Sequence, residues 1–310
     1  MIAVADELKG RSFTKMADWS REELEGLLDL ADALKAEPLQ PLLPGRTLGM
    51  IFHKPSTRTR VSFEVGMYQL GGIALYLSAN DLQLGRGETT RDTANVLSRY
   101  LDALMVRTFE QRDVEELADH ASIPVINGLT DAAHPCQVLA DLMTIRERRG
   151  ALEGTKLVYL GDGNNMCSSL MVGAATFGMT FVAATPEAYM PTPRAVEIAE
   201  GRAAESGGSV ELTTDPRAAV EGADVVYTDV WTSMGQEAEN ERRVRDLQGY
   251  GIDEQVVRAA AADVVVLHCL PAHYGEEITE DVVYGPHSAV FDQAENRLHA
   301  QKALLALIVR

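Results

Sequence analysis

Hydroxyl and guanidinium groups are concentrated in one short stretch, Phe52-His-Lys-Pro-Ser-Thr-Arg-Thr-Arg60. An apolar segment precedes this stretch and a helical pattern follows it. We therefore expect a strand-to-helix turn, at which Ser56 and Thr57 lie beside the free N–H groups of the helix. Arg58 adds a planar guanidinium that can hold a phosphate through two parallel hydrogen bonds. A plain helix cap with exposed arginines is the alternative, but this many anion-binding groups at one turn favours a phosphate site.

Two further polar residues stand where a strand ends or a helix begins. Arg107 ends the apolar run Ala-Leu-Met-Val-Arg, and His134 precedes a proline, which keeps His134 out of helical geometry. The carboxyl ends of parallel strands line the ligand-binding crevice of α/β proteins, so both side chains are candidates for that crevice. Each has a structural alternative, since a strand end can be merely solvated and a single histidine is usually structural. The stretch Gln83-Leu-Gly-Arg-Gly-Glu88 is, by its residues alone, more typical of a surface turn.

The second half of the chain carries two motifs for a small ligand. Val158-Tyr-Leu-Gly-Asp-Gly-Asn-Asn-Met166 has the first two glycines of a dinucleotide-binding turn, but Met166 occupies the place of the third. No acidic residue ends the next expected strand, so an NAD-dependent enzyme is a less favoured alternative. Asparagines at a helix start can instead bind a carboxylate. The turn Asp229-Val-Trp-Thr-Ser-Met-Gly235 offers a carboxylate, a hydroxyl and backbone N–H groups, which suits a zwitterionic amino acid better than a dicarboxylate.

Alternating strand and helix patterns must position these residues. They predict an α/β fold with two doubly wound parallel-sheet domains and the active site in the cleft between them. We expect residues 1–135, together with a C-terminal helix at 293–310, to form the first domain, and residues 136–292 to form the second. Ser20 to Glu23 has the pattern of a capping box that opens a helix. The expected strands are 48–52, 73–77, 103–106, 124–127, 156–160, 180–184, 210–212, 224–228, 264–267 and 289–291.

Composition excludes several classes of function. The 310 residues, 46% of them hydrophobic, suit two domains of ordinary size. A formal charge of −18 argues against nucleic-acid binding, and no apolar run approaches the length that spans a membrane. Three cysteines without metal-site spacing fit a reducing cytoplasm, and the N-terminus lacks the pattern of a signal peptide. The acidic charge predicts a protein that works in concentrated salt, with an ordinary acidic protein as the alternative.

The sequence resembles the aspartate and ornithine carbamoyltransferase family. Ser-Thr-Arg-Thr-Arg at 56–60 matches the carbamoyl-phosphate signature of that family, and His134-Pro-Cys-Gln137 also matches it. The likeness continues, with the motifs in the expected order, as far as Arg297. It implies that carbamoyl phosphate is bound by Ser56, Thr57, Arg58, Thr59, Gln83, Arg107, His134, Gln137, Cys269, Leu270 and Arg297.

Two motifs favour ornithine over aspartate as the acceptor. Asp-x-x-x-Ser-Met-Gly at 229–235 and His-Cys-Leu-Pro at 268–271 resemble the ornithine-type members, although Cys269 alone is equally typical of a small buried residue. The resemblance implies that ornithine is bound by Asn165, Asp229, Ser233 and Met234, and that the catalytic residues are Arg107, His134, Asp229 and Cys269. Putrescine, lysine or an N-acylated ornithine as acceptor, and an inactive ligand-binding relative, are the alternatives.

The resemblance also implies the reaction and the assembly. The δ-amine of ornithine would take the carbamoyl group, giving citrulline and phosphate, a step of arginine metabolism. No cofactor and no metal ion are expected, and the only expected ligands are the small-molecule substrates. Because the family is built from trimers, we expect a homotrimer or a multiple of trimers, in which the Gln83 loop can reach a neighbouring subunit.

Overall fold

The computed structural model describes residues 7–83, 87–232 and 237–309. The chain divides into two compact units, which are Met1–Met143 with Glu295–Arg310 (unit 1) and Thr144–Ala294 (unit 2). The helix α5 (Pro135–Arg149) runs without interruption through the division between Met143 and Thr144. The boundary expected from the sequence, after residue 135, falls at the first residue of this helix. No described helix is long and apolar enough to cross a membrane.

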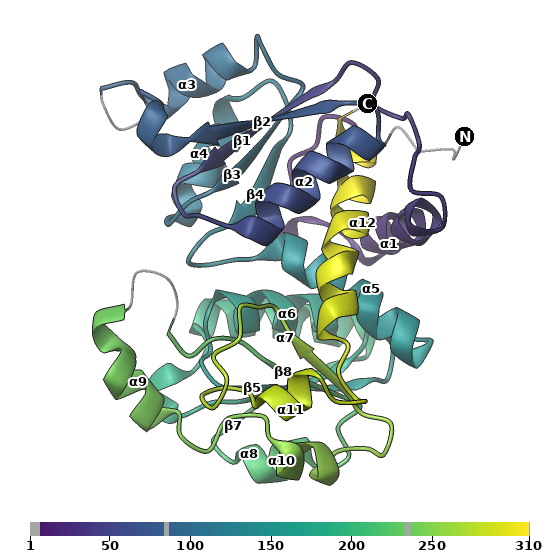
Figure 1. The fold of residues 1–310 in the computed structure, drawn as a ribbon, viewed down its shortest axis with the longest axis vertical. Helices are drawn as coiled ribbons and strands as arrows, with labels where there is room; N and C mark the ends of the chain where they lie inside the picture. Colours follow the sequence, from purple (N-terminus) through teal and green to yellow (C-terminus); the bar gives the residue numbers. More distant parts are fainter. Residues whose placement is uncertain (1–6, 84–86, 233–236, 310) are drawn as a thin grey trace. The chain divides into compact units, whose positions relative to one another are not determined.

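Unit 1 is built on a four-stranded parallel sheet in the order β2-β1-β3-β4 (Figure 1). The strands are β1 (Thr47–Phe52), β2 (Ile73–Ser78), β3 (Ala103–Arg107) and β4 (Val125–Leu129). The central strand β1 is buried along nearly its whole length, as expected of a parallel strand covered on both faces, whereas the edge strand β2 is largely exposed. The helices are α1 (Arg21–Ala36), α2 (Thr57–Gln69), α3 (Thr90–Leu97), α4 (Gln111–His120), the first part of α5, and α12 (Val290–Ile308) from Glu295 onward, with short 3-10 turns at η1 (Met16–Asp18) and η2 (Ala79–Asp81).

Two helix contacts explain how unit 1 is held together. The predicted capping box is present at α1, where Glu23 N donates to Ser20 Oγ at 3.3 Å and Ser20 N donates to Glu23 Oε2 at 2.7 Å. The last helix, α12, packs closely on α2 at a glycine. A Cβ atom at Gly66 would lie 3.2 Å from Lys302 Cγ, so the absence of a side chain there permits the close approach. This packing brings residues from the two ends of the chain into one core.

Unit 2 is built on a five-stranded parallel sheet in the order β7-β6-β5-β8-β9. The strands are β5 (Lys156–Leu160), β6 (Thr180–Ala184), β7 (Ser209–Thr213), β8 (Val225–Thr228) and β9 (Val265–His268). The other elements are α6 (Asn165–Thr176), α7 (Pro193–Ser206), α8 (Pro216–Val220), α9 (Asn240–Asp246), α10 (Glu254–Ala259), α11 (Glu280–Val283), η3 (Glu187–Tyr189) and η4 (Glu237–Glu239). The two sheets flanked by helices confirm the predicted α/β class with two parallel-sheet domains.

The prediction of a strand at 289–291 is wrong. A single parallel bridge joins Val266 to Ser288, with Ala289 N donating to Val266 O at 3.0 Å, and α12 then begins at Val290. The expected C-terminal helix at 293–310 therefore starts three residues earlier. A three-residue apolar run carries too little periodicity to separate a strand from a first helical turn.

Candidate active site

The predicted phosphate turn lies at the start of α2 in unit 1. Ser56 is the N-cap residue with extended backbone, and its Oγ accepts a hydrogen bond from Thr59 N at 3.3 Å. Thr57 and Arg58 occupy the first turn of the helix. The carboxyl end of β3 lies beside this turn, since His53 N donates to Arg107 O at 2.8 Å. The sequence therefore places a helix N-terminus, with its partial positive charge, next to the strand end that carries Arg107.

Arg297 on α12 joins three elements of unit 1. Its side chain is buried, and it donates from Nη1 to Gln137 Oε1 at 2.7 Å and from Nη2 to Thr59 Oγ1 at 3.2 Å. A third bond runs from Nε to Gln301 Oε1 at 2.9 Å on the same helix. Gln137 is held in turn, because its Nε2 donates to Asp141 Oδ1 at 2.9 Å. The guanidinium of Arg297 is thus fixed beside the first turn of α2.

His134 lies buried among these arginines. Burial, followed by the nearby guanidinium groups of Arg297 and Arg107, holds the pKa of His134 well below its usual value. Arg58 acts on the same ring in the same direction. His134 is therefore a neutral imidazole at neutral pH, able to hydrogen-bond a ligand without adding charge. We call Arg58, Thr59, Arg107, His134, Gln137 and Arg297 the unit 1 cluster, and its net charge suits a phosphorylated anion.

The thiol of Cys136 forms no hydrogen bond with this cluster among the described residues. Burial raises the pKa of the Cys136 thiol to about 12, and its Sγ donates to Asn127 O at 3.3 Å, so it packs as a neutral group. Gln83 is exposed beyond η2, and within the described part of the chain no hydrogen bond joins it to the unit 1 cluster.

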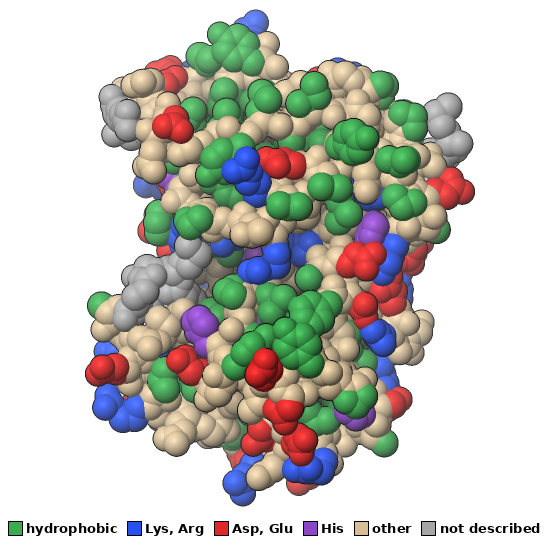
Figure 2. Space-filling model, in the orientation of Figure 1, with side chains coloured by type: hydrophobic (Ala, Val, Ile, Leu, Met, Phe, Trp, Pro, Cys, Tyr) green, Lys and Arg blue, Asp and Glu red, His purple; other side chains and the backbone are tan. Residues whose placement is uncertain are grey.

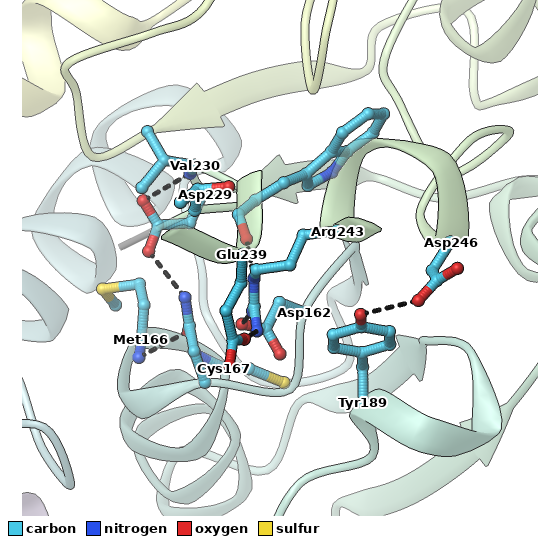
Figure 3. Close-up of polar contacts among 12 residues, drawn as sticks. Asp162, Met166, Cys167, Tyr189, Asp229, Val230, Glu239, Arg243 and Asp246 are labelled. Carbon is cyan, nitrogen blue, oxygen red and sulfur yellow. Dashed lines mark hydrogen bonds and ion pairs between the residues drawn. The ribbon is translucent and has the colours of Figure 1, made fainter. Parts of the chain in front are cut away.

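The carboxylate of Asp229, after β8, is the centre of polar contacts in unit 2 (Figure 3). Its Oδ2 accepts from Asn164 Nδ2 at 2.9 Å, and its Oδ1 accepts from Val230 N at 2.7 Å and Cys269 Sγ at 2.8 Å. Only 7% of Asp229 is exposed. We call Asn164, Asn165, Asp229 and Cys269 the unit 2 cluster.

Asn164 is a functional candidate that the sequence reasoning passed over in favour of Asn165. It is the N-cap of α6, and its Oδ1 accepts from Met166 N at 2.8 Å and Cys167 N at 3.1 Å. Asn165 is the first residue of the helix and is partly exposed. An asparagine directly before a helical pattern is a recognisable N-cap signal, so Asn164 was open to prediction. Ser233 and Met234, the other two predicted residues, lie outside the described residues.

A buried ion pair adjoins the unit 2 cluster. Arg243 on α9 pairs through Nη2 with Asp162, and its Nε donates to Trp231 O at 2.5 Å (Figure 3). Burial raises the pKa of Asp162 to about 6, although the charge of Arg243 acts to lower it. Asp162 lies within the Val158–Met166 motif but was given no role there, and no motif marked Arg243. Their pairing spans 81 positions, so local pattern gave no signal of it.

The Cys269–Leu270 turn after β9 is held by His268 and Glu277. Leu270 N donates to His268 Nδ1 at 2.8 Å, which leaves the proton of a neutral ring on Nε2, 3.1 Å from Glu277 Oε1. Glu277 Oε1 also accepts from His273 N at 2.6 Å. Ligand atoms of His273, Glu276 and Glu277 lie within 4.8 Å of one another, close enough for a metal ion. The contacts of Glu277 already explain its burial as support for the turn.

Comparisons with known proteins cover both units. Residues 11–147 match the family model described as the carbamoyl-P binding domain of aspartate/ornithine carbamoyltransferase, and residues 153–308 match its Asp/Orn binding domain. A curated relative from Symbiobacterium thermophilum, named ornithine carbamoyltransferase, is 59% identical over 97% of this chain and 99% of its own. One from Oceanobacillus iheyensis, with the same name, is 57% identical over 98% of this chain and 95% of its own. A solved ornithine carbamoyltransferase from Pyrococcus furiosus superposes with a TM-score of 0.95 at 54% identity, covering 99% of both chains.

Proposed function

The chain belongs to the aspartate/ornithine carbamoyltransferase family, and we propose that it transfers the carbamoyl group of carbamoyl phosphate to the δ-amine of L-ornithine, giving L-citrulline and phosphate. The observation that carries the choice of acceptor is the buried carboxylate of Asp229, fixed by Asn164 and Cys269. A carboxylate held in this way attracts an ammonium group and repels the side chain of aspartate. The names of relatives at 54–59% identity support the same choice.

The unit 1 cluster is proposed to hold the donor. Ser56, Thr57 and the first-turn N–H groups of α2 bind the phosphate together with Arg58. We assign Gln83 to the same site on the family resemblance alone. Gln137 and Arg297 bind the donor as a pair, since each fixes the other through their hydrogen bond.

The reaction is acyl transfer to nitrogen. The neutral amine attacks the carbamoyl carbon, the C–N bond forms, a tetrahedral oxyanion develops, and the C–O bond to phosphate breaks. Arg107, Thr59 and the neutral His134 are proposed to stabilise the oxyanion, with each donor worth about 3 kcal/mol in such sites. Arg58 stabilises the phosphate that leaves, and this phosphate is available to take the proton of the amine.

The unit 2 cluster is proposed to hold the acceptor. Asn165, at the positive end of α6, binds the α-carboxylate of ornithine, and Asp229 faces an ammonium group. Ser233 and the Met234 backbone complete this site on the family resemblance. The Cys269 and Leu270 carbonyls accept hydrogen bonds from the carbamoyl amide, while the Cys269 thiol lies near the reacting amine.

A colorimetric citrulline assay with purified protein tests this function. Carbamoyl phosphate is supplied with ornithine, aspartate, putrescine, lysine or N-acetylornithine in parallel reactions. N-acetylornithine belongs in the panel because a solved N-acetyl-L-ornithine transcarbamylase variant superposes with a TM-score of 0.88 at 33% identity. We expect ornithine to be used with the highest kcat/KM. Higher kcat/KM for any other acceptor, or no product from ornithine, would contradict the proposal.

We propose a homotrimer, or a multiple of trimers, on the family resemblance, and an apolar face of unit 1 supports self-association. Exposed apolar side chains follow one another along α2 and the edge strand β2, and Figure 2 shows hydrophobic side chains at the surface of this part of the molecule. They are Val61, Val65, Tyr68, Ile73, Leu75 and Tyr76, with exposed fractions from 36% to 74%. Such a face is unusual on a monomer, and a second copy would cover both it and the open strand edge. Light scattering of the wild-type chain and of Tyr68→Glu tests this, with a lower mass expected for the variant.

The cellular compartment, the direction of the reaction and the working salt concentration are proposed from single observations. None of the three cysteines forms a disulfide among the described residues, which supports a reducing cytoplasm. A relative from Pyrococcus furiosus at 55% identity is named an anabolic ornithine carbamoyltransferase, which favours arginine synthesis over arginine breakdown. The charge of −18 favours work in concentrated salt.

A further inference from the structure

Arg243 is not a member of the unit 2 cluster, but it contacts the two chain segments that carry Asn164 and Asp229. Its side chain is only 6% exposed and lies on α9, beyond both segments. The Nε group donates to the carbonyl of Trp231, two residues after Asp229. The Nη2 group pairs with Asp162, two residues before Asn164 (Figure 3).

These contacts close a ring. Asn164 Nδ2 donates to Asp229 Oδ2 at 2.9 Å, which joins the same two segments on the other side. The turn from β5 to α6 and the end of β8 are therefore tied together twice, once through Arg243 and once through Asn164 and Asp229. A guanidinium suits this place because its donors are fixed in one plane and reach a carbonyl and a carboxylate at once.

The remaining neighbours of Arg243 hold it against the cluster. Its Cζ lies 4.9 Å from the centre of the Tyr189 ring, and its Nη1 lies 3.7 Å from Glu239 Oε2. Tyr189 is itself fixed by a hydrogen bond from its hydroxyl to Asp246 Oδ2 at 2.9 Å. The guanidinium thus has a single defined placement, with partners on η3 and η4 as well as on the two segments.

We propose that Arg243 is a positioning residue for the amino-acid acceptor, which sets the affinity for ornithine by holding the Asp229 segment in register with the start of α6. The inference rests on the proposed carbamoyl transfer to ornithine. Arg243 does not contact the substrate in this account. It acts through Trp231 and Asp162, so the donor site of unit 1 is unaffected by its loss.

Steady-state kinetics of citrulline formation test the inference. Arg243→Met is expected to raise the KM for ornithine by about tenfold or more, since small displacements of binding groups cost at least this much. The KM for carbamoyl phosphate should stay within about twofold. Arg243→Lys should be intermediate, because an ammonium can pair with Asp162 but cannot supply the fork that also reaches Trp231. The matched control is Arg242→Met, whose side chain is 57% exposed and pairs only with Glu239 at 2.8 Å among the described residues.

Asp162→Asn keeps the inference testable if Arg243→Met does not fold. Asp162→Asn should raise the KM for ornithine in the same way. In the double variant with Arg243→Lys, the rise in this KM should be smaller than the product of the two single rises, because both changes break the same contact. Asp162 lies beside the charges of Arg243 and Asp229, and in the wild type its protonation below about pH 6 should add to the rise in the KM for ornithine that protonation of the amine itself causes. Asp162→Asn should remove only this added rise.

Two results would overturn the inference, and they are distinguishable from a failure of the proposed function. The first result is an unchanged KM for ornithine in the variants. The second is an equal rise in the KM for ornithine and the KM for carbamoyl phosphate, in proportion to the loss of thermal stability. Either result would give Arg243 a purely structural role. Wild-type protein that forms no citrulline would instead contradict the proposed function, and this inference with it.

Discussion

Arg297 Nη1 donates a hydrogen bond to Gln137 Oε1 at 2.7 Å, across 160 positions of the chain. The bond places the guanidinium of α12 beside the first turn of α2, where Thr59 accepts a second bond from it. Neither residue lies near the other in sequence, so the site in unit 1 depends on the packing of α12 against the rest of that unit. Each side chain therefore fixes the orientation of the other.

Arg297→Lys should weaken the binding of carbamoyl phosphate. A lysine retains the charge but cannot reach Gln137, Thr59 and the ligand in one plane. The loss of a charge-assisted hydrogen bond, about 1.5–3 kcal/mol, corresponds to a rise of about tenfold to a hundredfold in the KM for carbamoyl phosphate. Steady-state kinetics at saturating ornithine measure this, with the exposed Arg99→Lys as control. A rise confined to the KM for ornithine would contradict the assignment.

His134→Gln should lower kcat by about a hundredfold, since a neutral donor to the developing oxyanion is misplaced. Stability provides a second test. Burial lowers the pKa of His134, so the unfolded chain binds a proton more readily, and the folded state loses stability as the pH falls below about 6.5. Urea unfolding at pH 7.5 and 5.5 should show a smaller loss for His134→Gln than for the wild type. The exposed His120→Gln should behave as the wild type, and equal losses in all three proteins would be evidence against a buried neutral imidazole.

Asp229→Asn should act on the acceptor alone. An asparagine keeps an oxygen for Val230 N but loses the charge that attracts an ammonium group, so the KM for ornithine should rise by about tenfold to a hundredfold. The KM for carbamoyl phosphate should change little. Glu200→Gln, which alters an exposed carboxylate on α7, is the control. Unchanged kinetics for ornithine in Asp229→Asn would remove the acceptor assignment.

Much of the fold was open to prediction because its strands are continuous apolar runs. The strand expected at 156–160 is found as Lys156–Leu160, and that at 180–184 as Thr180–Ala184. Buried parallel strands must be apolar on both faces, so local composition is sufficient there. At 289–291 a similar apolar composition occurs at the start of α12 instead of in a strand. The strand-like pairing there is limited to the single bridge between Ser288 and Val266, which local composition does not reveal.

The candidate site was open to prediction where it consists of local motifs. Ser56 as a helix cap follows from a hydroxyl residue directly before a helical pattern. Arg243 and Asp162 had no such signal, because a buried ion pair is defined by two positions that the sequence does not relate. The support of Leu270 by His268 and Glu277 was missed for the same reason. The residues proposed to touch a ligand thus carried motifs, and the residues that orient them did not.

Salt should stabilise the folded chain. With a formal charge of −18, repulsion between surface carboxylates opposes folding, and counter-ions screen it within about 10 Å at 0.1 M ionic strength. The Tm should rise steadily between 0.05 M and about 1 M NaCl. Part of this rise should occur below about 0.3 M, where screening of charges dominates over the exclusion of salt from the protein surface. Scanning calorimetry with KCl and NaCl at equal ionic strength measures it. A Tm that stays constant over this range, with full activity in dilute buffer, would rule out adaptation to salt.

Glu277→Leu should disorganise the Cys269–Leu270 turn. The change leaves the buried Nε2 proton of His268 without its acceptor, which costs about 1–3 kcal/mol. It also removes the acceptor of the partly buried His273 N–H. Glu277 favours the tautomer of His268 with its proton on Nε2, and only in this tautomer can Nδ1 accept the hydrogen bond from Leu270 N. Without Glu277, both the His268 ring and the turn therefore lose their fixed orientation. We expect a lower midpoint of urea unfolding and a raised KM for carbamoyl phosphate, whose amide the Leu270 carbonyl is proposed to bind. Glu277→Gln, which still offers an oxygen to His268, should retain most of both properties. If Glu277→Leu and Glu277→Gln were equally impaired, the charge of Glu277 and not its acceptor atom would be the important feature, and the tautomer argument would fail.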